Sequence, residues 1–362
     1  MRTRVILLCT TLASPALADT PAVVTGTPVV QSLVAQVMGD LGTPDVLLDR
    51  GGDPHSFQLR PAQAQALEQA DLVFWVGPEL TPWLQRAIDG VEARGEVIGL
   101  LDAEGVFRQD FIHGHSHDHD HGHDDHGHDD LDHDHGHDDH GHDDHDHDHG
   151  HDDHGHDDHD HDHGHDDHGH DDHDHDHGHD DHGHDHAHDG VDPHAWLHPD
   201  NARVWIDVIA DDLSRHDPDN AETYAANAQS AKADIDEIEA QVRATLEPVG
   251  DAPIIVFHDA YGYLDTAFGV NVAGTIALGD AASPGAQRLA ELRAMLDERG
   301  VVCIFPEVNH SSAYVDVVVE NTGVRIGEEL DPAGVLLEYG PGQYGALMTG
   351  LAESIAACVT EG

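Results

Sequence analysis

The sequence predicts an α/β protein with two parallel-sheet lobes, joined by one long rigid helix, and a ligand cleft between the lobes. Short apolar and β-branched runs alternate with helical segments, an order typical of parallel βαβ units. One amphipathic segment of about 30 residues separates two such regions. Ligands of open parallel sheets bind at the carboxyl ends of strands, so a cleft between the lobes is the expected binding site.

The first lobe is predicted over residues 19–216, with a polar insertion inside it. Pro61 suits the first turn of a helix, and Gly77 and Pro78 mark the end of a strand. The expected strands are 22–25, 45–48, 72–76 and 96–100, and the expected helices are 29–38, 61–70, 79–88 and 199–213.

The linking helix is predicted over residues 217–248. Asp217 and Pro218 open it, and apolar residues then recur at steps of three and four, at Ala231, Ile235, Ile238, Val242 and Leu246. At 1.5 Å per residue, such a helix would cross a whole domain and act as a strut. Two shorter helices with a break between them are the alternative.

The second lobe, residues 249–362, repeats the alternation of strand and helix. The expected strands are 253–257, 272–276, 301–305 and 324–327, and the expected helices are 261–268, 284–299, 312–321 and 343–359. This pattern predicts a second parallel sheet.

Residues 113–188 form a tract that holds 33 of the 39 histidines, together with 29 aspartates. A 14-residue unit, HDHDHGHDDHGHDD, begins at residue 117 and recurs at 131, 145, 159 and 173 with two departures. Imidazole is a common ligand of zinc, copper and nickel. The tract has almost nothing apolar to bury, so we expect a disordered loop with many weak metal sites. A solvated acidic spacer is the alternative.

The charge of the chain limits its partners. The formal net charge is −58, and it is still −29 when the aspartates of the tract are left out. This acidity argues against nucleic acid as a partner. The 286 residues outside the tract are enough for two lobes that each have a core.

The N-terminus resembles a secretory signal. Arg2 and Arg4 precede an apolar run, and the small residues Ala16 and Ala18 favour cleavage after Ala18. No later run approaches the roughly 20 apolar residues of a spanning helix. We therefore expect a soluble, exported, periplasmic protein.

Cys303 and Cys358 are the two cysteines that remain after the predicted cleavage, because Cys9 leaves with the signal. An even count in an oxidising compartment favours a disulfide. The bridge would close a loop of about 55 residues and stabilise the fold by about 4 kcal/mol. Two buried thiols are the alternative.

Six histidines lie outside the tract, at positions 55, 194, 198, 216, 258 and 310. His55 and His258 follow predicted strands of opposite lobes, and His194 stands where the chain leaves the tract. Two strand-end histidines from opposite lobes would face one cleft. A single histidine in such a place is more often capped or solvated than a metal ligand, so spacing alone only suggests a metal site.

Four segments carry a resemblance to a known family. GGDPHSFQLRP (51–61), ADLVFWVGP (70–78), DPHAWL (192–197) and FHDAYGY (257–263) resemble the ZnuA-type zinc-binding proteins of ABC transporters, the metal-binding cluster A-I family. The resemblance covers nearly the whole mature chain, including an acidic histidine-rich loop. It implies a monomeric periplasmic protein that captures Zn²⁺ with high affinity and delivers it to an inner-membrane ABC permease for zinc uptake. It further implies His55, His194 and His258 as metal ligands and a bridge between Cys303 and Cys358.

The fourth metal ligand is open. Some zinc relatives have a glutamate immediately before the first histidine, where this chain has Pro54. Asp331 matches the position of a carboxylate ligand in manganese relatives and some zinc relatives, and we favour it. Glu307, at another strand end, and water are the alternatives, and capping a turn is an alternative role for Asp331. Three imidazoles with at most one carboxylate favour zinc over manganese, whose relatives use two histidines and two carboxylates.

Other functional classes fit the sequence less well. An open fourth position would suit a catalytic zinc, but the chain has no HExxH motif and no general base is evident beside the histidines. We therefore expect no enzymatic activity. The remaining alternatives are a metal-storage or chaperone protein in which the tract is the functional part, and a binding protein for another divalent metal such as manganese.

Overall fold

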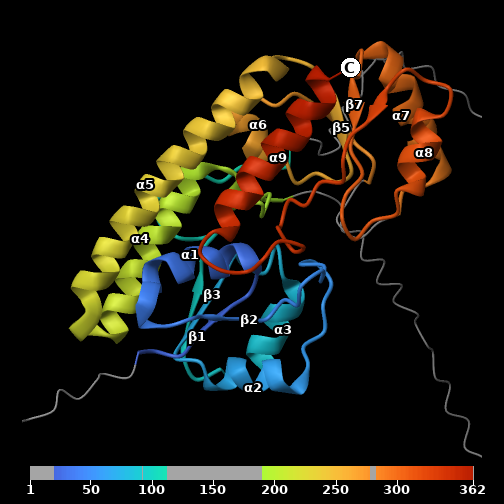
Figure 1. Ribbon diagram of the computed structural model, residues 1–362. Coiled ribbons are helices and arrows are strands. Elements are labelled where there is room, and N and C mark those ends of the chain that lie inside the picture. The colour runs from blue at the N-terminus through green and yellow to red at the C-terminus, as the bar shows by residue number, and fades with distance from the viewer. Residues whose placement is uncertain (1–19, 92, 112–189, 278–282, 362) are drawn as a thin grey trace, which may run out of the picture. The chain divides into compact units, whose positions relative to one another are not determined.

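Two four-stranded parallel sheets organise the computed structural model, which describes residues 20–91, 93–111, 190–277 and 283–361 (Figure 1). The predicted signal peptide, Cys9 and the histidine-rich tract lie outside the described residues. The described residues belong to one compact unit. The predicted domain boundaries, 19–216, 217–248 and 249–362, stay predictions.

The first sheet has the strand order β2-β1-β3-β4. Its strands are β1 (Val23–Thr25), β2 (Asp45–Val46), β3 (Leu72–Trp75) and β4 (Glu96–Gly99), and its connecting helices are α1 (Pro28–Met38), α2 (Pro61–Gln69) and α3 (Pro82–Val91). Every residue of β1 and β3 is buried, as expected for central parallel strands. Helix α3 begins at Pro82 and not at the predicted Glu79, because proline at the first helical position fixes the start.

The second sheet repeats this order as β6-β5-β7-β8. Its strands are β5 (Ile254–Val256), β6 (Val272–Thr275), β7 (Cys303–Ile304) and β8 (Arg325–Ile326), and its helices are α6 (Gly262–Phe268), α7 (Ala286–Glu298), α8 (Ala313–Val319) and α9 (Gln343–Thr360). Ile254 and Val256 belong to the larger hydrophobic core, while Ile255 and Phe257 pack into a smaller one with α7 and α8. This alternation follows the two-residue period of a strand and covers both faces of the sheet.

The shared strand order determines where a ligand site forms. In each lobe the chain passes from the first strand to a neighbour on one side and then to a neighbour on the other side. The topological switch point therefore lies between β1 and β3 in the first lobe and between β5 and β7 in the second. His258 follows β5 and Glu307 follows β7, so both lie next to the second switch point.

Helix α5 (Ala221–Leu246) is one unbroken helix of 26 residues after a short 3-10 turn (Pro218–Asn220). The alternative of two shorter helices is therefore wrong, and the α/β fold with two parallel sheets is confirmed. Helix α5 contacts α1 and α4 (Pro199–His216) of the first lobe, and α6 and α9 of the second. Figure 1 shows it alongside α4 and α9. At 1.5 Å per residue it is about 39 Å long.

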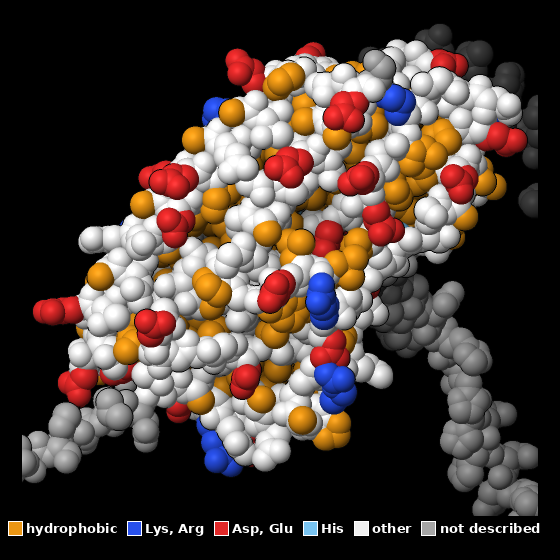
Figure 2. Space-filling view, in the orientation of Figure 1, with side chains coloured by type: hydrophobic (Ala, Val, Ile, Leu, Met, Phe, Trp, Pro, Cys, Tyr) orange, Lys and Arg blue, Asp and Glu red, His pale blue; other side chains and the backbone are white. Residues whose placement is uncertain are grey.

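A disulfide joins Cys303 of β7 to Cys358 of α9, with a Cα–Cα distance of 6.3 Å. The predicted bridge is therefore present, and it fastens the last helix to a central strand of the second sheet. In the part of the chain that the structure describes, none of the helices combines the length and apolar character that crossing a bilayer requires. Acidic side chains are spread over the face shown in Figure 2, where basic ones are few.

Candidate metal centre

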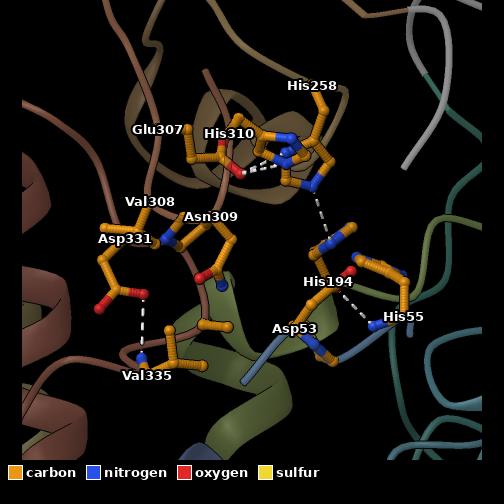
Figure 3. Close-up of a pocket in the computed structure, with 13 residues that line it drawn as sticks. Asp53, His55, His194, His258, Glu307, Val308, Asn309, His310, Asp331 and Val335 are labelled. Atoms are coloured by element: carbon orange, nitrogen blue, oxygen red, sulfur yellow. Dashed lines mark hydrogen bonds and ion pairs between the residues drawn. The ribbon is translucent and has the colours of Figure 1, made fainter. Parts of the chain in front are cut away.

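A small cavity collects histidines and carboxylates from both lobes (Figure 3). Its volume is about 20 Å³, room for one ion or water molecule, whereas pockets for organic ligands measure about 300–1,000 Å³. The titratable residues that line it are Asp53, His55, His194, His258, Glu307, His310 and Asp331. The size and lining suit a metal ion better than an organic solute.

His55, His194 and His258 come together in this cavity. One ring nitrogen of each lies within 4.8 Å of the others, and the ring centroids are 5.2 to 5.8 Å apart. His194 and His258 are buried, and His55 is partly exposed. The structure thus places together the three histidines that the family resemblance implies as ligands.

The same tripeptide, Asp-Pro-His, positions two of these histidines. The Oδ1 atom of Asp53 accepts a hydrogen bond of 2.9 Å from the backbone N–H of His55, and Asp192 does the same for His194, also at 2.9 Å. Such turns let an aspartate fix the backbone two residues later, and the intervening proline restricts its own φ. The repeat of this tripeptide at residues 53–55 and 192–194 is a signal of this geometry in the sequence itself.

Asp192 also orients the ring of His194. Its Oδ1 atom lies 2.8 Å from Nδ1 of His194, and both side chains are almost completely buried. Burial raises the pKa of Asp192, against the opposing effect of its hydrogen bonds with His194. A proton on Nδ1 of His194 satisfies this carboxylate and leaves Nε2 as the metal-binding atom.

Glu307 lies beside His258 in the same way that Asp192 lies beside His194. Its Oε1 atom lies 2.6 Å from Nδ1 of His258, and the hydroxyl of Tyr261 donates a hydrogen bond of 3.1 Å to Oε2. Burial and the charge of Glu307 raise the pKa of Tyr261 well above its ordinary value, so this hydroxyl keeps its proton. Two histidines of the site are thus each paired with a buried carboxylate on the Nδ1 side.

The Nε2 atoms of His194 and His258 are 3.4 Å apart. With the ring protons on Nδ1, both atoms present lone pairs to one point and cannot hydrogen-bond to each other. Two ligands of a tetrahedral ion with Zn–N bonds of about 2.0–2.1 Å are separated by about 3.3–3.4 Å. The spacing therefore matches one edge of a tetrahedral zinc site.

Asp331 lines the cavity, but its oxygens have other partners. Oδ1 accepts a hydrogen bond from the N–H of Val335 and Oδ2 from that of Leu336, both at 2.9 Å. Burial raises its pKa, against the effect of these backbone hydrogen bonds. Asp331 is not part of the cluster of ligand atoms formed by the three histidines. Its role as fourth ligand stays a prediction, while the alternative role of capping a turn agrees with these contacts.

The loop that carries His55 is tied to the Asp331 loop of the other lobe. The Arg50 side chain donates hydrogen bonds of 3.0 and 2.5 Å to the carbonyl of Leu336, and the Gly51 N–H donates one of 2.9 Å to Val335. Gly51 has φ of 75°, a conformation that favours glycine. These contacts fix the segment that leads to His55, which is partly exposed and lines the cavity.

His310 is a further member of the cluster, although it stands in none of the four family motifs. Its Nε2 atom lies 3.7 Å from Oε1 of Glu307, and its ring stacks on Phe257 at 4.2 Å. The sequence places it only three residues after Glu307, which is a weak signal by itself. The other two histidines outside the tract, His198 and His216, cap or end helix α4.

A family model described as "Zinc-uptake complex component A periplasmic" matches residues 23–358. The chain belongs to the ZnuA family. Among its relatives, the "High-affinity zinc uptake system protein ZnuA" of Paracoccus denitrificans (strain Pd 1222) is 46% identical over 349 residues, which cover 96% of this chain and 95% of the relative. The protein with the same name from Brucella suis biovar 1 is 35% identical over 330 residues, covering 91% and 89%. The resemblance predicted from the four motifs is confirmed.

Solved structures agree with the ZnuA-family fold. The periplasmic zinc-binding protein TroA from Treponema pallidum has a TM-score of 0.67 at 18% identity, over 94% of this chain and 99% of that one. FpvC from Pseudomonas aeruginosa, solved in complex with Mn²⁺, has a TM-score of 0.65 at 18% identity, over 94% and 98%. Because these two proteins were named or solved with different metals, the fold does not decide the metal. The ligand set has to decide it.

Proposed function

We propose that this chain is a periplasmic protein that captures Zn²⁺ with high affinity and delivers it to an ABC permease for zinc uptake. The observation that carries the proposal is the convergence of His55, His194 and His258 on one ion-sized cavity. Membership of the ZnuA family and the names of the two relatives support zinc uptake as the role.

The donor set favours zinc as the cargo. Three imidazole nitrogens suit zinc, whereas manganese prefers sites rich in oxygen ligands. The 3.4 Å spacing of the two Nε2 atoms supports the same choice. We propose His55, His194 and His258 as ligands, with Asp331, Glu307 or water completing the set.

We propose that the histidine-rich tract collects zinc at many weak sites and feeds the cavity. The described residues on either side of the tract pair with each other, because Asp110 and Val191 form an antiparallel bridge and Asp192 donates a hydrogen bond of 2.9 Å to Gln109. Asp192 in turn holds His194. The tract therefore ends six residues before a proposed ligand, and this proximity favours local transfer of metal.

We propose that the protein acts as a monomer. The family is a component of a transport system, so we propose a carrier without enzymatic activity. Export by a signal peptide cleaved after Ala18 agrees with the periplasmic description of the family.

Competitive titration with zinc and manganese tests this function, using the mature protein with and without residues 113–188. We expect one tight zinc equivalent in both forms, with manganese bound weaker by orders of magnitude, and further weak zinc equivalents only in the full-length form. Cells with the deletion should grow more slowly only when zinc is scarce. A deletion protein without tightly bound zinc would place the main site in the tract, as in a storage protein.

A further inference from the structure

We propose a second, weaker zinc position formed by His310, Glu307 and His258, which the ion occupies before it reaches the three-histidine site. One ligand atom from each residue lies within 4.8 Å of the others. The proposal rests on the proposed function in that it takes zinc as the cargo. It adds a zinc position next to the site of His55, His194 and His258, called the main site below, and a route by which the ion enters that site.

The geometry places two imidazoles around one carboxylate oxygen. Oε1 of Glu307 lies 2.6 Å from Nδ1 of His258 and 3.7 Å from Nε2 of His310. The centroids of the two histidine rings are 6.0 Å apart. Ligands of a tetrahedral zinc ion lie about 3.3 Å from one another, so each of the two carboxylate–imidazole distances has to change by less than 1 Å.

The surrounding structure holds His310 in this place. Its ring is nearly parallel to that of Phe257, with an interplanar angle of 15°. Its backbone N–H donates a hydrogen bond of 3.2 Å to the backbone carbonyl of Glu307. The preceding residue, Asn309, has φ of 70°, a conformation that few residues other than glycine adopt. This left-handed turn, which asparagine adopts more readily than most residues other than glycine, directs His310 toward Glu307.

Exposure suggests the order in which the two positions are used. The His310 side chain is 25% exposed, against 2% for His194 and 4% for His258. An ion that approaches along the His310 side therefore meets His310 before the buried pair, whereas on the other side it meets the partly exposed His55 first. With fewer imidazoles and more exposure to water, the second position should bind zinc more weakly.

His258 is shared and serves one position at a time. Its Nε2 atom faces His194, and its Nδ1 atom faces Glu307. A neutral imidazole has one lone pair, so an ion bound at Nδ1 requires the proton on Nε2, and an ion bound at Nε2 requires it on Nδ1. Transfer of zinc between the positions therefore exchanges ion and proton across one ring, with no net gain or loss of protons.

A variant without the main site tests the proposal in protein that lacks residues 113–188. The double variant His55→Ala, His194→Ala removes two ligands of the main site and leaves His258, Glu307 and His310. We expect it to bind one zinc equivalent more weakly than the parent, and we expect addition of His310→Ala to weaken that binding at least tenfold. The matched control is addition of His216→Ala, a histidine paired with Glu96 at the end of α4, which should change nothing.

Two zinc-binding results would overturn the second zinc position. A double variant that is folded by circular dichroism but binds no zinc would overturn the second position, as would residual binding that His310→Ala leaves unchanged. If the alanine pair does not fold, the pair His55→Gln, His194→Gln keeps polar side chains next to Asp53 and Asp192 and takes its place. Failure of the proposed function gives a different result, because the parent protein with an intact main site would then bind no zinc tightly.

The rate of zinc loading tests the proposed route. In protein with the main site intact, stopped-flow mixing with zinc should show slower loading in His310→Ala than in His216→Ala. Equal rates in the two variants would overturn the route through His310.

Discussion

The Nε2 atoms of His194 and His258 lie 3.4 Å apart, although the two residues are separated by 64 positions in the sequence. The Nδ1 atom of each lies beside a buried carboxylate, at 2.8 Å from Asp192 and 2.6 Å from Glu307. Partners of this kind fix the tautomer and orientation of metal-binding histidines and raise their basicity. The pair is therefore prepared to receive a cation before any metal arrives.

Removal of one imidazole should weaken zinc binding strongly. In protein without residues 113–188, His258→Ala should lower the zinc affinity by orders of magnitude, because the ion loses a bond and the enclosed geometry. Competition with a zinc-chelating dye measures this affinity. His216→Ala is the control, and a His258→Ala protein that binds as tightly as its parent would show that the ligand assignment is wrong.

Asp192 should affect zinc affinity without touching the ion. The substitution Asp192→Asn keeps the shape of the side chain but removes the charge that supports the ring of His194. We expect zinc affinity to fall by about 10- to 100-fold, the usual cost of losing such a partner. The exposed residue Asp102, changed to asparagine in the same background, provides the comparison. Equal affinities in the two variants would contradict the orienting role of Asp192.

The disulfide should contribute to stability. Replacing Cys303 and Cys358 by serine should lower the free energy of unfolding by about 4 kcal/mol, because the unfolded chain loses the constraint of the closed loop. Urea unfolding of both proteins measures the difference. Intact-mass analysis of periplasmic protein should find no free thiol, and two alkylatable cysteines would contradict the bridge.

Glu239 should make stability depend on pH. It accepts hydrogen bonds from Arg203 of α4 at 2.6 Å and from Arg243 at 3.0 Å. Burial acts to raise the pKa of Glu239, but these hydrogen bonds outweigh it and hold the pKa below its ordinary value. The contribution is therefore fully present above the pKa of the unfolded chain and is lost as the pH falls through the lower pKa of the folded protein.

The substitution Glu239→Gln tests this contribution. We expect it to lower the free energy of unfolding by about 0.5–1 kcal/mol at neutral pH, the scale of partly exposed ion pairs. The difference from the parent protein should shrink as the pH is lowered below about 4.5. Urea unfolding at several pH values measures it, and a difference that stays constant with pH would show that the charge of Glu239 is not the cause.

The sequence predicted the fold in more detail than the site. The spacing of Ala231, Ile235 and Val242 predicted α5 because a buried helical stripe has a fixed period. The predicted strand 301–305 is shortened to Cys303–Ile304, where β7 pairs with the two residues of β8, and such pairing depends on the partner strand. Local patterns predict an element better than they predict its ends.

The site was only partly predictable because several contacts depend on distant parts of the chain. His55, His194 and His258 stand in motifs that can be recognised from the sequence. His310 cannot be placed in this way, because its position depends on the φ of Asn309 and on stacking against a residue of another segment. Asp331 before a proline suits both a ligand and a turn cap, and only the structure shows its hydrogen bonds to the backbone.

The central claim is that one zinc ion binds between His55, His194 and His258. Anomalous diffraction at the zinc edge, from crystals of zinc-loaded protein without residues 113–188, tests it most directly because it locates the ion itself. We predict one strong peak about 2.0–2.1 Å from a ring nitrogen of each of the three histidines. A peak elsewhere in the protein, with these three histidines outside bonding distance, would contradict the account.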